Sequence, residues 1–202
     1  GVASIPDVGG VILVANHRSY FDACTLALVA VEMNRPVRFL AKREMFDIGP
    51  FAWMLKAIGG IPVDRGTGSV TPLRAAEAAL GAGEAVVILP EGTIPRGEAA
   101  REPVLHGKTG AARLAASTGA PVVPIGLWGT ERVWPRSARV PDVTGVHRVS
   151  VRVGRPVDLS LHDAVGDTEL IMAAIGDLLP EEARAARTPS ADELSEIFSA
   201  YR

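Results

Sequence analysis

The chain has almost no cysteine and no apolar run long enough to cross a membrane. Its one cysteine, Cys24, excludes a disulfide within the chain and fits a reducing compartment. The longest uncharged stretch, residues 114–130, contains glycines and prolines that prevent it from forming one spanning helix. Any contact of these residues with a membrane is therefore expected to be peripheral.

The sequence also lacks an excess of positive charge and a serine nucleophile motif. The net charge of −2 and the lack of a basic tract argue against a nucleic-acid partner. No Gly-x-Ser-x-Gly segment occurs, so the sequence offers no nucleophile elbow. His106, His147 and His162 lack partners at metal-ligand spacing, and we expect no metal and no other cofactor.

The residues that are present indicate an α/β fold. Short runs rich in valine and isoleucine predict strands buried on both faces, and the segments between them predict helices. This alternation predicts a single layered domain over residues 1–202, with a mostly parallel central sheet flanked by helices. The expected strands are residues 11–15, 37–41, 85–89, 121–127 and 149–153, and the expected helices are residues 22–33, 50–58, 71–82 and 108–117.

The two ends of the chain carry weaker signals. Residues 158–202 are expected to form a helical C-terminal tail, in which residues 190–193 resemble a capping box at the start of a terminal helix. No signal peptide is visible, and the first expected strand begins close to the N-terminus. We therefore expect the chain to be a piece of a longer protein.

Residues 16–22, Asn-His-Arg-Ser-Tyr-Phe-Asp, directly follow the first expected strand. Residues five apart do not share a face of a continuous helix, so His17 and Asp22 can meet only if the chain turns between them. Asp22 could then orient the imidazole and stabilise its protonated form, as a general base requires. Ser19 is interpreted as a turn residue, so the activated hydroxyl is expected to belong to the substrate. The alternative is a simple turn, with Asp22 as a charge at a helix N-terminus.

Three further segments join this histidine motif. They are residues 39–46 (Phe-Leu-Ala-Lys-Arg-Glu-Met-Phe) continued by 59–66 (Gly-Gly-Ile-Pro-Val-Asp-Arg-Gly), residues 89–97 (Leu-Pro-Glu-Gly-Thr-Ile-Pro-Arg-Gly), and residues 122–130 (Val-Val-Pro-Ile-Gly-Leu-Trp-Gly-Thr). In this order, the four segments resemble the sequence blocks of the glycerolipid acyltransferases, the family of lysophosphatidate acyltransferase. The resemblance covers residues 11–157.

The resemblance implies a role for each matching residue. His17 would deprotonate the acceptor hydroxyl as it attacks an acyl thioester, and Asp22 would orient His17. Acceptor binding falls to the second and third blocks, at the matching positions Arg65, Glu91, Gly92 and Thr93. An arginine can clamp a phosphate monoester, and Gly92 would let the backbone approach the ligand closely. Lys42 is either a second phosphate contact or a strand-end charge; Arg65 and Glu91 have similar alternatives as a surface charge and a loop carboxylate.

The third block departs from the family pattern at one position. The family usually has Glu-Gly-Thr-Arg, whereas Ile94 follows Thr93 here. We predict that Arg96 supplies the displaced positive charge, because a bend at Pro95 could return it to the same pocket. The departure leaves the identity of the acceptor open.

The expected function is transfer of a fatty acyl group from acyl-CoA or acyl-carrier protein to the hydroxyl of a lysophospholipid. The expected acceptor is 1-acylglycerol 3-phosphate, which would give phosphatidate, and the expected location is the cytoplasmic face of the cell membrane. Alternatives are another lipid or glycolipid acceptor, a phospholipid donor, thioester hydrolysis and a silent lipid-binding module. The apolar segment 48–58 is either a helix at the membrane surface or a core helix.

Overall fold

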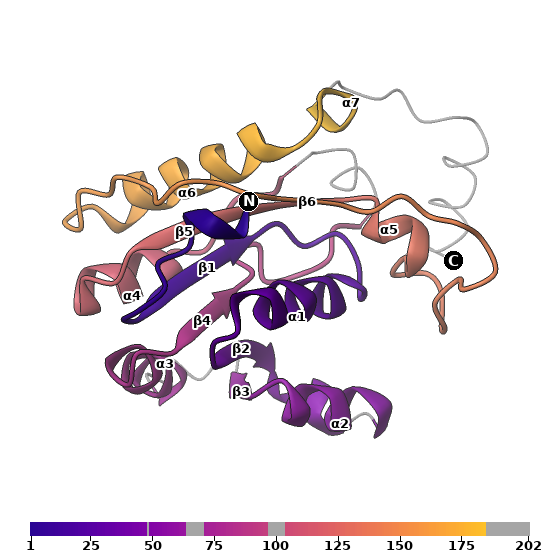
Figure 1. The fold of residues 1–202 in the computed structure, drawn as a ribbon, viewed down its shortest axis with the longest axis horizontal. Helices are drawn as coiled ribbons and strands as arrows, with labels where there is room; N and C mark the ends of the chain where they lie inside the picture. Colours follow the sequence, from indigo (N-terminus) through magenta and orange to yellow (C-terminus); the bar gives the residue numbers. More distant parts are fainter. Residues whose placement is uncertain (48, 64–70, 97–103, 185–202) are drawn as a thin grey trace.

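A six-stranded sheet forms the centre of the structure (Figure 1), a computed structural model that describes residues 1–47, 49–63, 71–96 and 104–184. The strand order is β3-β2-β4-β1-β5-β6. All neighbouring pairs among strands β1 to β5 are parallel. Strand β6 pairs with β5 in the antiparallel direction. The strands are β1 (Val11–Ala15), β2 (Val37–Lys42), β3 (Gly60–Val63), β4 (Ala85–Ile88), β5 (Val122–Trp128) and β6 (Ser150–Val153). The predicted α/β fold with a mostly parallel sheet is confirmed.

Helices follow most of the strands and cover the sheet. Within the described residues they are α1 (Asp22–Met33), α2 (Gly49–Ala57), α3 (Thr71–Gly81), α4 (Gly110–Thr118), α5 (Thr130–Val133), α6 (Ala164–Leu178) and α7 (Glu181–Arg184), with 3-10 turns η1 (Val2–Ser4) and η2 (Arg43–Asp47). None of the helices in this part of the chain is both long enough and apolar enough to cross a bilayer. The capping box expected at residues 190–193 lies outside the described residues.

The core lies on both faces of the sheet because successive side chains of a strand point to opposite sides. On β1, Ile12 and Val14 face a cluster that includes residues of α3, α4 and α6, whereas Val11, Leu13 and Ala15 face a second cluster that includes residues of α1. Every residue of β1 and of β4 is buried. The continuous apolar runs at these positions therefore predicted double-sided burial correctly.

Two strand predictions need correction. The short strand β3 was not expected, because Gly60 and Pro62 weaken a strand signal; β3 lies at the edge of the sheet, where a proline is tolerated. Strand β6 lies at the opposite edge, and its side chains are half-buried or exposed rather than buried on both faces. Strand β2 is also only partly covered, with Phe39 as its one buried residue.

The topology gathers the sequence motifs at one edge of the sheet. Because β1 to β4 are parallel, their carboxyl ends lie on the same side, where open α/β sheets usually bind ligands. His17 follows β1, Lys42 ends β2 and Glu91 follows β4. Arg65, which follows β3 in the sequence, lies outside the described residues.

Candidate active site

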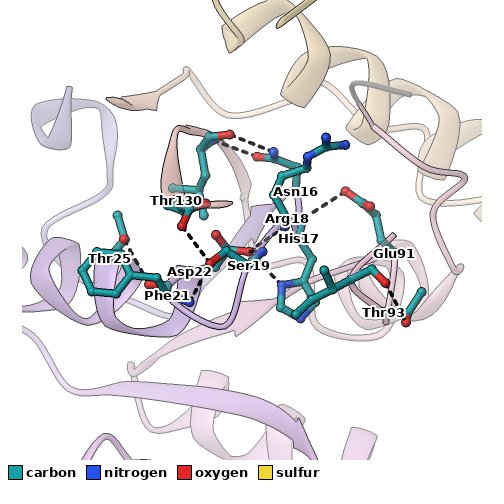
Figure 2. Close-up of polar contacts among 12 residues, drawn as sticks. Asn16, His17, Arg18, Ser19, Phe21, Asp22, Thr25, Glu91, Thr93 and Thr130 are labelled. Carbon is teal, nitrogen blue, oxygen red and sulfur yellow. Dashed lines mark hydrogen bonds and ion pairs between the residues drawn. The ribbon is translucent and has the colours of Figure 1, made fainter. Parts of the chain in front are cut away.

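His17 and Asp22 meet, as the turn between them predicted. His17 lies in the loop between β1 and α1, and Asp22 is the first residue of α1. The chain turns so that Nδ1 of His17 is 2.8 Å from Oδ2 of Asp22 (Figure 2). The His17 side chain is 21% exposed, whereas the Asp22 side chain is fully buried. The pair therefore combines an accessible imidazole with a carboxylate that water does not reach.

The surroundings of Asp22 determine which nitrogen of His17 carries the proton. Oδ2 of Asp22 accepts hydrogen bonds from the backbone N–H of Arg18 at 2.7 Å and of Ser19 at 2.8 Å. An oxygen that accepts from two N–H groups acts as an acceptor toward the imidazole as well, so Nδ1 of His17 is the donor. In neutral His17, Nε2 then keeps a lone pair and can accept a proton.

Ser19 holds the loop and is not arranged as a nucleophile. Its Oγ accepts a hydrogen bond from the N–H of Phe21 at 2.9 Å, and lies 2.9 Å from the carbonyl oxygen of Thr130 and 2.6 Å from that of Trp134. Ser19 is fully buried, and the ring of Tyr20 packs edge-on against Trp134. The hydroxyl thus joins the His17 loop to α5, in agreement with its interpretation as a turn residue.

Asn16 fastens the other end of the loop, a role that the sequence interpretation missed. Its side chain is fully buried; Nδ2 donates to the carbonyl oxygen of Leu127 at 2.9 Å, and Oδ1 accepts from the N–H of Leu127 at 2.8 Å. The backbone pairing of β1 with β5 ends at Ala15 and Ile125. The Asn16 amide therefore continues the pairing with its side chain and frees the backbone to turn toward His17.

Replacement of Asn16 by alanine is expected to lower the free energy of unfolding by about 2–4 kcal/mol, because a buried N–H and a buried C=O of Leu127 lose their partners. Urea unfolding followed by circular dichroism measures this. The exposed Glu32→Ala on α1 is the control and should change the value by less than about 0.5 kcal/mol. Equal stability of the two variants would contradict the role of Asn16.

Glu91 reaches the same loop from β4. Its Oε1 accepts a hydrogen bond from the backbone N–H of His17 at 3.0 Å, and the residue is only 4% exposed. Burial raises the pKa of the Glu91 carboxyl, although its hydrogen bond with His17, the charge of Arg18 and the backbone of Leu105 act in the opposite direction. Glu91 thus contacts the main chain of the candidate base.

The side chain of Lys108 lies next to Gly92. Gly92 has a φ of +66°, a left-handed conformation that glycine adopts without strain. A side chain at this position would meet the Lys108 side chain, whose Nζ is 3.1 Å from where the Cβ would lie. Lys108 is therefore the neighbour of Gly92 on this side, and the close approach of a ligand to the Gly92 backbone stays a prediction.

The other expected acceptor contacts differ in exposure and in pairing. Lys42 is partly exposed, and its Nζ is 2.9 Å from Oε1 of Glu44. Thr93 and Arg96 are exposed, whereas Ile94 is 4% exposed and points into the protein. Burial of Ile94 means that it is a packing residue and presents no group to a ligand. That Arg65 and Arg96 share a pocket in front of His17 stays a prediction, because Arg65 lies outside the described residues.

Comparison with known proteins shows which family the sequence matches. A family model described as acyltransferase matches residues 1–128. A chloroplastic 1-acyl-sn-glycerol-3-phosphate acyltransferase of Arabidopsis thaliana is 30% identical over 156 residues, which are 76% of this chain and 41% of that protein. A 1-acyl-sn-glycerol-3-phosphate acyltransferase of Streptococcus pneumoniae is 26% identical over 149 residues, 74% of this chain and 50% of its own length.

A solved structure shares the fold. The 1-acyl-sn-glycerophosphate acyltransferase of Thermotoga maritima superposes with a TM-score of 0.64 at 24% identity, covering 94% of this chain and 72% of that one. The matches cover only about two fifths to a half of the length of the curated relatives named above. Since the family model covers more than half of the chain, the resemblance of the four sequence blocks is confirmed: the chain belongs to the acyltransferase family.

Proposed function

We propose that the chain is the catalytic part of an O-acyltransferase that uses His17 as a general base. The observation that carries the proposal is the contact of 2.8 Å between Nδ1 of His17 and Oδ2 of Asp22, which leaves Nε2 available. The hydroxyl of Ser19 is engaged within the loop, so it is a poor candidate for a covalent acyl-enzyme. The arrangement favours direct attack by a hydroxyl of the acceptor.

The proposed reaction is balanced by two proton transfers. The acceptor O–H gives its proton to Nε2 of His17 while its oxygen attacks the carbonyl carbon of an acyl thioester. The tetrahedral intermediate collapses, the C–S bond breaks, and the thiolate takes the proton back from the imidazolium. Asp22 stabilises the imidazolium between the two transfers, and the protein holds both reactants in place.

The proposed substrates follow from the family membership and from the relatives. The donor is acyl-CoA or acyl-carrier protein, and the acceptor is 1-acylglycerol 3-phosphate, which gives phosphatidate. Two relatives named above carry 1-acyl-sn-glycerol-3-phosphate acyltransferase in their names, which supports this acceptor. Arg96, together with Lys42 and Arg65, would bind the phosphate of the acceptor.

One observation favours a second candidate acceptor. Ile94 is buried where the family usually has arginine, and Lys42 is paired with Glu44. These features reduce the positive charge available to a phosphate, so a lipid or glycolipid acceptor without a phosphate monoester is the alternative.

An acceptor screen with one labelled acyl-CoA tests the proposal. Phosphatidate as the main product supports the first candidate, and acylation of monoacylglycerol or of a glycolipid supports the second. Release of CoA at the same rate with and without any acceptor would instead indicate a thioester hydrolase and contradict transfer.

The proposed location is the cytoplasmic face of the cell membrane, with peripheral contact. Trp53 on α2 is 76% exposed, although Leu55 on the same helix is buried in the core. A tryptophan suits the membrane interface because its ring is apolar and its N–H is polar. Helix α2 thus packs through Leu55 and presents Trp53 to solvent, which supports a place for this helix at the membrane surface.

Substitution of Trp53 by alanine is expected to weaken binding to vesicles of phosphatidylcholine and phosphatidylglycerol about tenfold, because a large apolar ring is removed from the contact. Vesicle sedimentation measures the binding. Val146→Ala serves as the control, since Val146 is fully exposed in the loop before β6 and has no part in the proposal. Equal binding by both variants would remove Trp53 from the membrane surface.

A further inference from the structure

Glu91 joins the ends of two neighbouring strands. It comes three residues after the end of β4, and His17 comes two residues after the end of β1. The parallel pairing of these strands reaches Val14 and Ile88. Beyond that point, the hydrogen bond from the N–H of His17 to Oε1 of Glu91, at 3.0 Å, continues the connection through a side chain.

The surroundings of Glu91 do not suit a contact with an acceptor. The residue is 4% exposed, and Oε2 is buried without a hydrogen-bond partner among the described residues. A carboxylate that recognised the acceptor would need to reach solvent. It would also repel a phosphate monoester, because both groups are negatively charged.

We infer that Glu91 is a positioning residue, which acts on the reaction through the main chain of His17 rather than through the acceptor. Asp22 holds the ring of His17 and Glu91 holds its backbone, so the base is fixed at two points. Such fixing matters because a misplacement of about 1 Å can cost about 100-fold in rate. The inference rests on the proposed function, since it concerns the base of that reaction.

The substitutions Glu91→Gln and Glu91→Ala distinguish positioning of the His17 backbone from contact with the acceptor. Glutamine keeps an oxygen that can accept from His17, whereas alanine removes it. We expect E91A to lower kcat by about 10- to 100-fold with the acceptor KM within about twofold of wild type. We expect E91Q to retain kcat within about threefold, with an unchanged pH profile, because the hydrogen bond does not require a charge.

Two comparisons complete the design. Arg96→Ala is the reference for lost acceptor binding and should raise KM more than it lowers kcat. Glu32→Ala on the exposed side of α1 should match wild type in both constants. The inference is overturned if E91Q raises the acceptor KM like R96A, or if E91Q loses as much kcat as E91A. If E91A does not fold, the inference is overturned when E91Q raises the acceptor KM like R96A or lowers kcat by more than about threefold.

A second measurement does not depend on activity. Amide hydrogen exchange at His17 should be faster in E91A than in wild type, and near wild type in E91Q, because only alanine removes the acceptor of that N–H. Unchanged exchange in E91A overturns the inference. If wild type shows no acyl transfer but exchange follows this pattern, the proposed function fails while the backbone contact stands.

Discussion

Replacement of His17 by alanine is expected to lower kcat for acyl transfer by about 10²- to 10⁴-fold, the usual contribution of a positioned general base. In the proposed reaction the His17 ring takes the acceptor proton, and Ser19 does not replace it because its hydroxyl is engaged with Phe21, Thr130 and Trp134. The fold should persist because the N–H of His17 can still donate to Glu91. Transfer from labelled acyl-CoA measures the loss.

The matched control for this variant is His162→Ala. His162 is exposed before α6, so its loss should leave kcat unchanged. Circular dichroism and thermal unfolding of H17A exclude a folding defect. A folded H17A variant with wild-type kcat would remove the general-base mechanism, whatever the acceptor is.

The central sheet could be predicted because its strands carry a strong local signal. Residues 11–15 and 85–88 are continuous apolar runs, and burial on both faces follows from such runs. The position of β4 between β1 and β2 could not be predicted this way, because strand order depends on long-range pairing. Strand β3 was missed because its glycine and proline weaken the local pattern, and only its place at the edge makes them acceptable.

The candidate site also contains one contact that the sequence predicted and others that it could not predict. The contact of His17 with Asp22 could be expected because the two residues are close in sequence and a turn between the first strand and the first helix brings them together. The contact of His17 with Glu91 joins residues 74 positions apart, and that of Asn16 with Leu127 joins residues 111 positions apart. Neither can be derived from spacing, because both depend on which strands become neighbours.

The surroundings of Gly92 also depend on a contact that the sequence does not predict. Gly92 has a φ of +66°, a backbone conformation that other residues adopt with strain. The sequence does not tell what fills the space that the missing side chain leaves. Lys108, sixteen positions later, lies there because its N–H donates to the carbonyl oxygen of Pro90 and brings the two segments together.

Substitution of Asp22 by asparagine is expected to lower kcat by about 10²- to 10³-fold while the His17 loop keeps its shape. The N–H groups of Arg18 and Ser19 select an oxygen at the position of Oδ2, so the amide oxygen should lie there and still accept from Nδ1. The tautomer of His17 is then retained, and the loss comes from the missing negative charge beside the imidazolium.

The amide nitrogen of the D22N variant would occupy the position of Oδ1, which is buried without a partner in the described part of the chain. We therefore also expect a loss of about 1–3 kcal/mol in the free energy of unfolding. Asp163→Asn is the control, because Asp163 caps α6 at the surface and asparagine caps equally well. Kinetics and urea unfolding of both variants distinguish the effect of the lost charge on kcat from the effect of the substitution on stability. A D22N variant with wild-type kcat would show that the carboxylate positions the loop but does not stabilise the protonated base.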